Sequence, residues 1–226
     1  MLRHLLTSAL FAGLAAGLLA TVLQLAFVVP LIFEGELYET GARLHFSATG
    51  SPQSPVGHPS IWVEPARHIG TFAMNLVTWS GFAFILIAGF AMAERYGAKI
   101  DAKTGAIWGL CGFIAIQLAP AAGLPPELPG SVGADLATRQ LWWMGTVAAT
   151  MGGLGLFAFG RGAVAYGIAA LLLILPHAIG APELDTYYGV APAELSAHYT
   201  ARALAVGTAS WAILGAVAGA VWSRPA

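Results

Sequence analysis

Apolar residues run along this chain in six long stretches that are separated by shorter polar segments. The stretches cover approximately residues 5–33, 68–93, 104–123, 140–159, 162–181 and 200–222. Crossing about 30 Å of hydrocarbon takes roughly 20 mostly apolar residues in a helix. The pattern therefore predicts an all-α polytopic membrane protein whose six transmembrane helices form one domain over residues 1–226. We expect three hairpins, at approximately 5–94, 104–159 and 162–222, and a long first outer loop at 34–66.

Composition supports a membrane protein. Of the 226 residues, 58% are hydrophobic and 9% are charged, with a mean hydropathy of +0.74, whereas soluble domains carry about 25% charged residues. A net charge of −1 with ten Lys and Arg residues leaves no basic surface for nucleic acid. The lipid bilayer is therefore the expected partner, and the single cysteine, Cys111, excludes an intramolecular disulfide.

The basic residues predict how the chain is oriented. Short loops rich in Lys and Arg stay in the cytoplasm, and six spans place one group of basic residues on one side: Arg3, Arg95, Lys99, Lys103, Arg161 and Arg224. Both termini are therefore predicted to be cytoplasmic. Nine of the 11 carboxylates fall on the opposite side, so we expect an acidic outer face.

The first outer loop has two predicted parts. Residues 34–45 could continue the first helix, although Gly41 favours an early end. Residues 47–55 are rich in Ser, Gly and Pro and are predicted to form turns or coil.

One arrangement of residues recurs three times. An apolar run closes at a proline, carboxylates follow, and an arginine opens the next run: Pro30 then Arg67, Pro120 then Arg139, and Pro176 then Arg202. The tripeptide Gln-Leu-Ala also precedes the first two prolines, at 24–26 and 117–119. These similarities suggest an internal threefold repeat of one hairpin, and chance similarity between apolar segments is the alternative. Repeats commonly form substrate sites where they meet in transporters.

Polar side chains within the spans have a structural interpretation. Gln24, Asn75 and Gln117 are the amides there, and their usual role is hydrogen bonding between helices. A polar track is the alternative. Three GxxxG pairs, at 13 and 17, 105 and 109, and 215 and 219, predict close helix packing.

The outer connections carry candidate metal ligands. Imidazole and carboxylate together suit divalent cobalt, nickel or zinc. The candidates are His177, Glu127, Glu183, His68, Glu34, Glu36 and His198. Glu127 follows two prolines that would hold it in a fixed position. The alternative for each is a structural hydrogen bond or a solvated charge.

Other charged residues fit structural ion pairs at helix entrances. Asp135 precedes Arg139 by four residues, Glu64 precedes Arg67 by three, and Glu194 precedes His198 by four. An acid at such a position also complements a helix N-terminus. We expect mainly ion pairing from Arg67, Arg139, Arg202, Asp135, Glu64 and Glu194. No P-loop, HExxH or GxSxG motif is present, so we expect no enzyme and no tightly bound cofactor.

Three segments resemble a known family, the predicted cobalt transporter family CbtA. They are 124–130 (Leu-Pro-Pro-Glu-Leu-Pro-Gly), 139–143 (Arg-Gln-Leu-Trp-Trp) and 175–182 (Leu-Pro-His-Ala-Ile-Gly-Ala-Pro). The resemblance, which extends over nearly the whole chain, singles out Glu127, Arg139 and His177. It implies a multi-pass protein of the bacterial inner membrane that imports cobalt for cobalamin synthesis, with a small histidine-rich membrane partner, CbtB. A homo-oligomer of this chain is compatible with the sequence.

The sequence thus favours a permease subunit for divalent transition metals, cobalt above all. Acids at 34, 36, 127 and 183 would gather the ion, which would then pass a site near His177 and His68. The first alternative is a scaffold that does not transport and that binds partners in a larger complex. The second is a haem-bearing subunit with His68 and His177 as axial ligands.

Overall fold

The structure is a computed structural model that describes residues 2–45, 59–60, 62, 64–186 and 189–224. The prediction of an all-α polytopic membrane protein is confirmed, since six helices among these described residues are long and apolar enough to cross a membrane. These spans are Leu2–Phe27, Pro65–Arg95, Ala102–Ala121, Leu136–Phe159, Gly162–Ile179 and Ala193–Trp222. Within the described residues, the extended pairing is limited to one isolated bridge between Ser131 and Gly189. The predicted coil at 47–55 falls outside these residues.

The first predicted span is divided near its proline. Helix α1 is Leu2–Phe27 and helix α2 is Val29–Glu39. Pro30 stands in the first turn of α2, where a missing N–H costs nothing. Gly41 has a φ of +74° and so ends the helical run. Helix α2 therefore continues the helical run beyond the first span and ends where the glycine indicated.

The other two prolines of the recurring arrangement also lie near helix ends. Helix α4 (Ala102–Phe113) passes into a π-helical turn, η1 (Ile114–Leu118), and then into the short α5 (Ala119–Ala121), which contains Pro120. Pro176 lies in the last turn of α7 (Gly162–Ile179), which Gly180 terminates with a φ of +86°. Proline removes one helical hydrogen bond, and before Pro120 the π-helical turn accommodates that loss.

The chain clusters into two compact units. The first unit comprises Met1–Leu25, Trp62–Ile114 and Ala205–Ala226, and the second comprises Ala26–Ile61 and Ala115–Leu204. The sequence-based expectation of a single domain with three hairpins stays a prediction.

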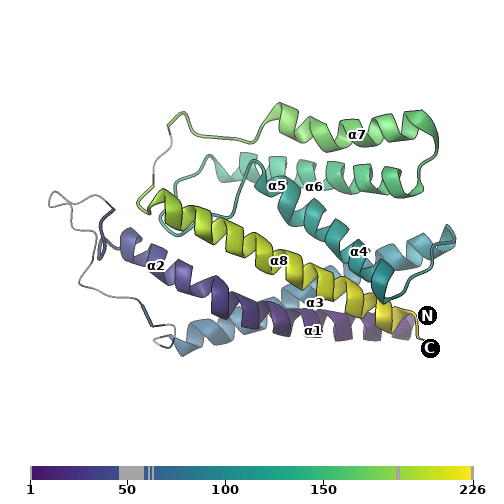
Figure 1. Ribbon diagram of the computed structural model, residues 1–226, viewed down its shortest axis with the longest axis horizontal. Coiled ribbons are helices and arrows are strands. Elements are labelled where there is room, and N and C mark those ends of the chain that lie inside the picture. The colour runs from purple at the N-terminus through teal and green to yellow at the C-terminus, as the bar shows by residue number, and fades with distance from the viewer. Residues whose placement is uncertain (1, 46–58, 61, 63, 187–188, 225–226) are drawn as a thin grey trace. The chain divides into compact units, whose positions relative to one another are not determined.

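The first unit packs through small residues. Helix α1 lies beside α3 (Pro65–Arg95) in Figure 1, and a Cβ added to Gly13 would meet Ser80 Cα at 2.4 Å. Helix α4 approaches α8 (Ala193–Trp222) as closely, since a Cβ at Gly109 would meet the carbonyl oxygen of Trp211 at 2.1 Å. Glycine is required wherever two helix backbones come so near. The predicted close packing at the GxxxG pairs is thus present in this unit.

The two chain ends meet in the first unit. His4 Nε2 lies 3.0 Å from the carbonyl oxygen of Trp222, and the two rings are 5.1 Å apart. The indole N–H of Trp222 donates to Glu94 Oε1 at 2.9 Å. Three helix ends, those of α1, α3 and α8, are therefore joined at one end of this unit (Figure 1).

The second unit contains α2, the helical hairpin formed by α6 (Leu136–Phe159) and α7, and the beginning of α8. Helices α6 and α7 run side by side in Figure 1 and are joined by a turn at 160–161. Gly153 faces Ala169 and Leu173, and the rings of Phe157 and Tyr166 stack at 6.0 Å. The connections 122–135 and 180–192 also belong to this unit and carry several of the candidate residues.

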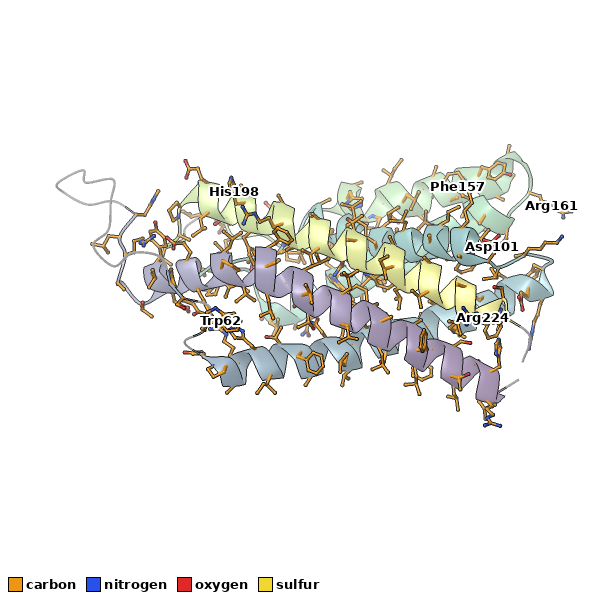
Figure 2. All side chains as sticks on the ribbon, turned by 60° about the horizontal axis from the view of Figure 1, so that its bottom comes forward. Trp62, Asp101, Phe157, Arg161, His198 and Arg224 are labelled. Carbon is orange, nitrogen blue, oxygen red and sulfur yellow. The ribbon has the colours of Figure 1, made fainter. Side chains whose placement is uncertain are left out.

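Within each unit, residues that the sequence assigns to opposite sides lie at opposite ends. In the first unit, Trp62 lies at one end and Asp101 and Arg224 at the other (Figure 2). In the second unit, His198 and Arg161 occupy opposite ends (Figure 2). This is the arrangement that successive membrane crossings produce. Which side is cytoplasmic stays a prediction.

Candidate functional site

The connection between α5 and α6 holds Glu127 in place through its neighbours on either side. The carbonyl oxygen of Pro126 accepts a hydrogen bond from Thr200 Oγ1 of α8 at 2.9 Å. Leu128, which is 3% exposed, packs against Gly35 of α2, because a Cβ on that glycine would meet it at 3.1 Å. With proline φ angles fixed, these contacts set the position of the backbone at Glu127.

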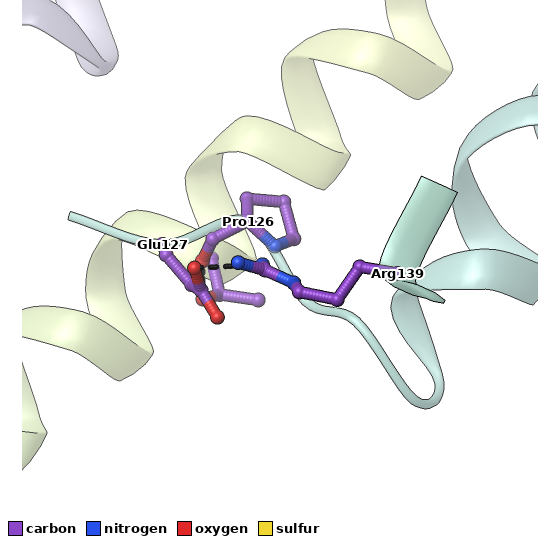
Figure 3. Close-up of polar contacts among 4 residues, drawn as sticks. Pro126, Glu127 and Arg139 are labelled. Carbon is purple, nitrogen blue, oxygen red and sulfur yellow. Dashed lines mark hydrogen bonds and ion pairs between the residues drawn. The ribbon is translucent and has the colours of Figure 1, made fainter. Parts of the chain in front are cut away.

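The Glu127 carboxylate forms an ion pair with Arg139. Arg139 Nη2 of α6 donates to Glu127 Oε2 at 2.9 Å (Figure 3), and the Arg139 and Glu127 side chains are 24% and 36% exposed. Gly133 gives the guanidinium room, since a Cβ there would lie 2.3 Å from Nη1. Asp135, the sequence neighbour expected to pair with Arg139, instead caps α6, because Oδ2 accepts from the Thr138 N–H at 3.1 Å. Arg139 thus neutralises the acid on the proline-rich connection.

His177 lies at the end of α7, beside Trp142 of α6. The indole N–H of Trp142 donates to the carbonyl oxygen of Pro176 at 3.1 Å, and the Trp142 and His177 rings are 6.2 Å apart in an edge-on arrangement. Gly123 packs nearby, since a Cβ on it would meet Trp142 at 2.9 Å. The imidazole itself is exposed. Its position is therefore set by the backbone and by the tryptophan, while its nitrogens stay accessible.

Helix α2 carries two further candidates. Glu34 forms an ion pair with Arg43, and both side chains are largely buried, at 16% and 14% exposed. The Arg43 guanidinium also lies 6.0 Å from the centre of the Tyr38 ring, within the range of a cation–π contact. Glu36 is partly buried on the same helix. Glu34 is therefore a neutralised acid, like Glu127.

The remaining predicted residues are distributed over both units. His68 and the pair formed by Glu64 and Arg67, whose N···O distance is 3.8 Å, belong to the start of α3 in the first unit. Glu183 is exposed on the connection after α7. Glu194, His198 and Arg202 are exposed along the first turns of α8, and among the described residues no ion pair joins them. Their pairing stays a prediction.

The described residues do not gather three or more His, Cys, Asp or Glu side chains in a group that could hold a metal ion. A single carboxylate or imidazole binds a divalent ion weakly, since stable sites use several ligands. The ligand roles given to His177, Glu127, Glu183, His68, Glu34, Glu36 and His198 stay predictions. As placed, these residues offer single contacts and not a closed coordination shell.

Sequence reasoning missed several residues that fix this region. Thr200 and Trp142 donate to the carbonyls of the residues directly before Glu127 and His177, and Arg43 pairs with Glu34. Only the Arg43 pairing had a visible signal, a basic residue in an acidic segment. Asp101 was also missed as the cap of α4, although Asp-x-x-Thr before an apolar run is a capping pattern. Hydrogen bonds from Thr104 hold the pKa of the Asp101 carboxyl below its ordinary value of 3.8.

Six apolar helices with charged connections define a multi-pass α-helical membrane protein. The family described as probable cobalt transporter subunit (CbtA) matches residues 2–223, nearly the whole chain. The chain therefore belongs to this family, as the three motifs indicated. No match was found among curated proteins or among solved structures. Membership indicates a transporter component with cobalt as the transported substrate and, because the family is described as a subunit, a partner component.

Proposed function

We propose that this protein is the membrane-spanning permease subunit that carries cobalt across the bacterial inner membrane, in support of cobalamin synthesis. A small histidine-rich membrane protein, CbtB, would deliver the ion to it. The observation that carries this proposal is the family match over residues 2–223. The six spans and the acids on the connections are compatible with such a role.

The ion pair of Glu127 with Arg139 is better suited to the passage of a cation than to its tight binding. Arg139 engages Oε2 of Glu127, so only Oε1 is left for an arriving cation, which must also compete with the guanidinium. Conduction requires binding that is favourable enough for entry and weak enough for release. A neutralised, partly exposed acid meets both conditions, whereas several free carboxylates would retain a divalent ion. His177 would offer the ion a nitrogen ligand.

Uptake of radioactive cobalt by cells that express the protein, with and without CbtB, tests the proposal. We expect uptake above that of cells with an empty vector, and reduced uptake for Glu127→Gln and for His177→Ala at unchanged protein levels. Asp101→Asn is the matched control: it removes an exposed acid but retains a capping oxygen. No uptake by the native protein under either condition would contradict the proposal.

A non-transporting scaffold is the second candidate, and the Glu127–Arg139 pair favours it. In a scaffold the pair serves only to hold the connection against α6. The double exchange Glu127→Arg with Arg139→Glu restores an ion pair of reversed polarity. A scaffold should then keep its function, whereas a cation route should lose it, because the cation would meet the guanidinium first.

A further inference from the structure

Gln117 carries a buried oxygen that finds no hydrogen-bond donor among the described residues. It belongs to the π-helical turn η1 and to the span Ala102–Ala121, so this oxygen, Oε1, lies within the membrane-crossing region. Short π-helical turns within helices are frequent at functional sites. A buried acceptor without a donor is costly, and it calls for an explanation.

The other glutamine of the recurring Gln-Leu-Ala tripeptide has a different environment. Gln24 Oε1 accepts a hydrogen bond from Asn75 Nδ2 at 2.9 Å, so it serves to join α1 to α3. Gln117 Oε1 has no such donor in the part of the chain that the structure describes. The Gln24 oxygen therefore joins two helices, whereas the Gln117 oxygen, in the same tripeptide, has no such structural role among the described residues.

The remaining buried hydroxyls and the indole without partners are explained by their own chemistry. Thr150, Ser8 and Ser210 carry hydroxyls, which can rotate towards a carbonyl oxygen of their own helix. The indole N–H of Trp211 lies in a cluster of rings, with Phe82 centred 4.7 Å away, and can point towards a ring face. An amide oxygen can only accept a hydrogen bond.

The backbone around Gln117 adds further oxygens. Pro120 has no N–H to offer the preceding turn. The N–H groups of Gly123 and Leu124 both donate to the carbonyl of Pro120, at 3.1 and 2.8 Å, and that of Ala122 donates to Ala119 at 3.2 Å. None of these three returns to the π turn, and because Pro120 has no N–H, one carbonyl of the turn loses its helical donor. The turn therefore has a second acceptor besides Gln117 Oε1 that lacks its usual donor.

We infer that Gln117 Oε1 and the carbonyl oxygen that Pro120 leaves without a donor, both within residues 115–118, form an intramembrane binding position for a divalent metal cation. Amide and carbonyl oxygens are suitable ligands for such ions. They can also accept hydrogen bonds from the water molecules that a cation retains. The inference rests on the proposed function for the identity of the ion, which would be cobalt, and it adds a position within the membrane to the acids of the connections.

The test uses the full-length protein purified in lipid nanodiscs, with CoCl₂ as the probe and thermal unfolding as the readout. At roughly a hundredfold excess of cation over its Kd, we expect the native Tm to rise by about 5 to 10 °C. Gln117→Leu should abolish this shift, yet its metal-free Tm should equal or exceed that of the native protein, because the substitution removes an unpaired acceptor. Gln117→Glu should increase cobalt affinity at least about tenfold, since it adds a charge to the position.

Gln24→Leu is the matched control. It leaves Asn75 without one acceptor, so its metal-free Tm should fall while its cobalt-induced shift persists. Two results would overturn the inference. One is a cobalt-induced rise in Tm for Gln117→Leu that equals that of the native protein. A water molecule, and not a metal ion, would then be the hydrogen-bond partner of the Gln117 oxygen. The other is failure of Gln117→Leu to fold without metal, which would show that the oxygen holds the helices together.

The binding measurement separates this inference from the proposed function. If cells show no cobalt uptake but the purified protein binds cobalt through Gln117, the transport proposal fails and the site stands. If uptake is normal in Gln117→Leu and the thermal shift is unchanged, the site fails and the transport proposal stands.

Discussion

Asn75 of α3 donates a hydrogen bond from Nδ2 to Gln24 Oε1 of α1 at 2.9 Å, and its Nδ2 also lies 3.2 Å from Thr21 Oγ1. Asn75 and Thr21 are 8% and 6% exposed. Gly17 lets the helices approach, since a Cβ on it would meet the Asn75 carbonyl oxygen at 3.1 Å. A donor shared by two acceptors thus joins the two helices within the hydrocarbon, where water cannot replace it.

Removal of this donor should weaken the first unit. We expect Asn75→Leu to lower the free energy of unfolding by about 0.6 kcal/mol, and by at most about 1.7 kcal/mol, the range measured for hydrogen bonds between membrane helices. Unfolding by sodium dodecyl sulfate, followed by circular dichroism, would measure it. Thr71→Val is the control, because its exposed hydroxyl bonds within its own helix, to Arg67 at 3.1 Å. Equal losses from both variants would refute a helix-joining role.

The contact between α4 and α8 should tolerate no side chain at Gly109. Gly109→Ala places a methyl group 2.1 Å from the Trp211 carbonyl oxygen, so the helices must separate, at a cost of about 1 to 3 kcal/mol. Gly81→Ala on α3 meets no atom within 4 Å and should stabilise the helix by up to about 1 kcal/mol. Thermal unfolding of both variants measures the contrast. A neutral Gly109→Ala would show that the helices are not in backbone contact.

Trp142 should support the end of α7 through its hydrogen bond to Pro176. Trp142→Phe keeps a ring beside His177 but loses the N–H, and we expect a loss of about 0.5 to 1.5 kcal/mol. The cost should lie near the lower bound, because the Gly180 N–H also donates to this carbonyl, at 3.1 Å. Trp143→Phe, at an exposed neighbouring tryptophan, is the control in the same unfolding measurement. Identical stability of the two variants would argue against the bond.

The ion pair of Glu127 and Arg139 should matter more for transport than for folding. Both groups are partly exposed, so Arg139→Gln should change stability by less than about 1 kcal/mol. If cobalt meets Glu127 on its route, the unpaired carboxylate should bind the ion more tightly, and the KM for cobalt uptake should fall several-fold. Arg67→Gln at the 3.8 Å pair with Glu64 is the control. An unchanged KM in Arg139→Gln would favour the scaffold.

The capping carboxylate of Asp101 should make stability depend on pH under acidic conditions. Its Oδ1 accepts from the Thr104 N–H at 2.7 Å, and the pKa of the folded protein lies below the ordinary 3.8. A lowered pKa stabilises the folded protein above the unfolded value, and this contribution is lost as pH falls through the folded value. In Asp101→Asn, which caps but does not titrate, the unfolding midpoint should change less with pH below 3.8. Equal slopes for both proteins would contradict this.

Sequence alone determined the six spans. Their number followed from the apolar runs and the thickness of the hydrocarbon, and the irregular turn before Pro120 has a local cause, a missing N–H, which is a covalent property of the chain. The end of α2 before Gly41 has the same kind of local cause.

Only the tertiary structure decided which polar groups find each other. Arg139 pairs with Glu127, 12 residues away, because Gly133 leaves room for the guanidinium, while Asp135 caps α6. Gln24 meets Asn75, whereas the oxygen of Gln117, in the same tripeptide, meets no donor among the described residues. The physical reason is that backbone geometry is set by near neighbours, while side-chain pairing depends on which distant segments pack within about 3 Å of each other.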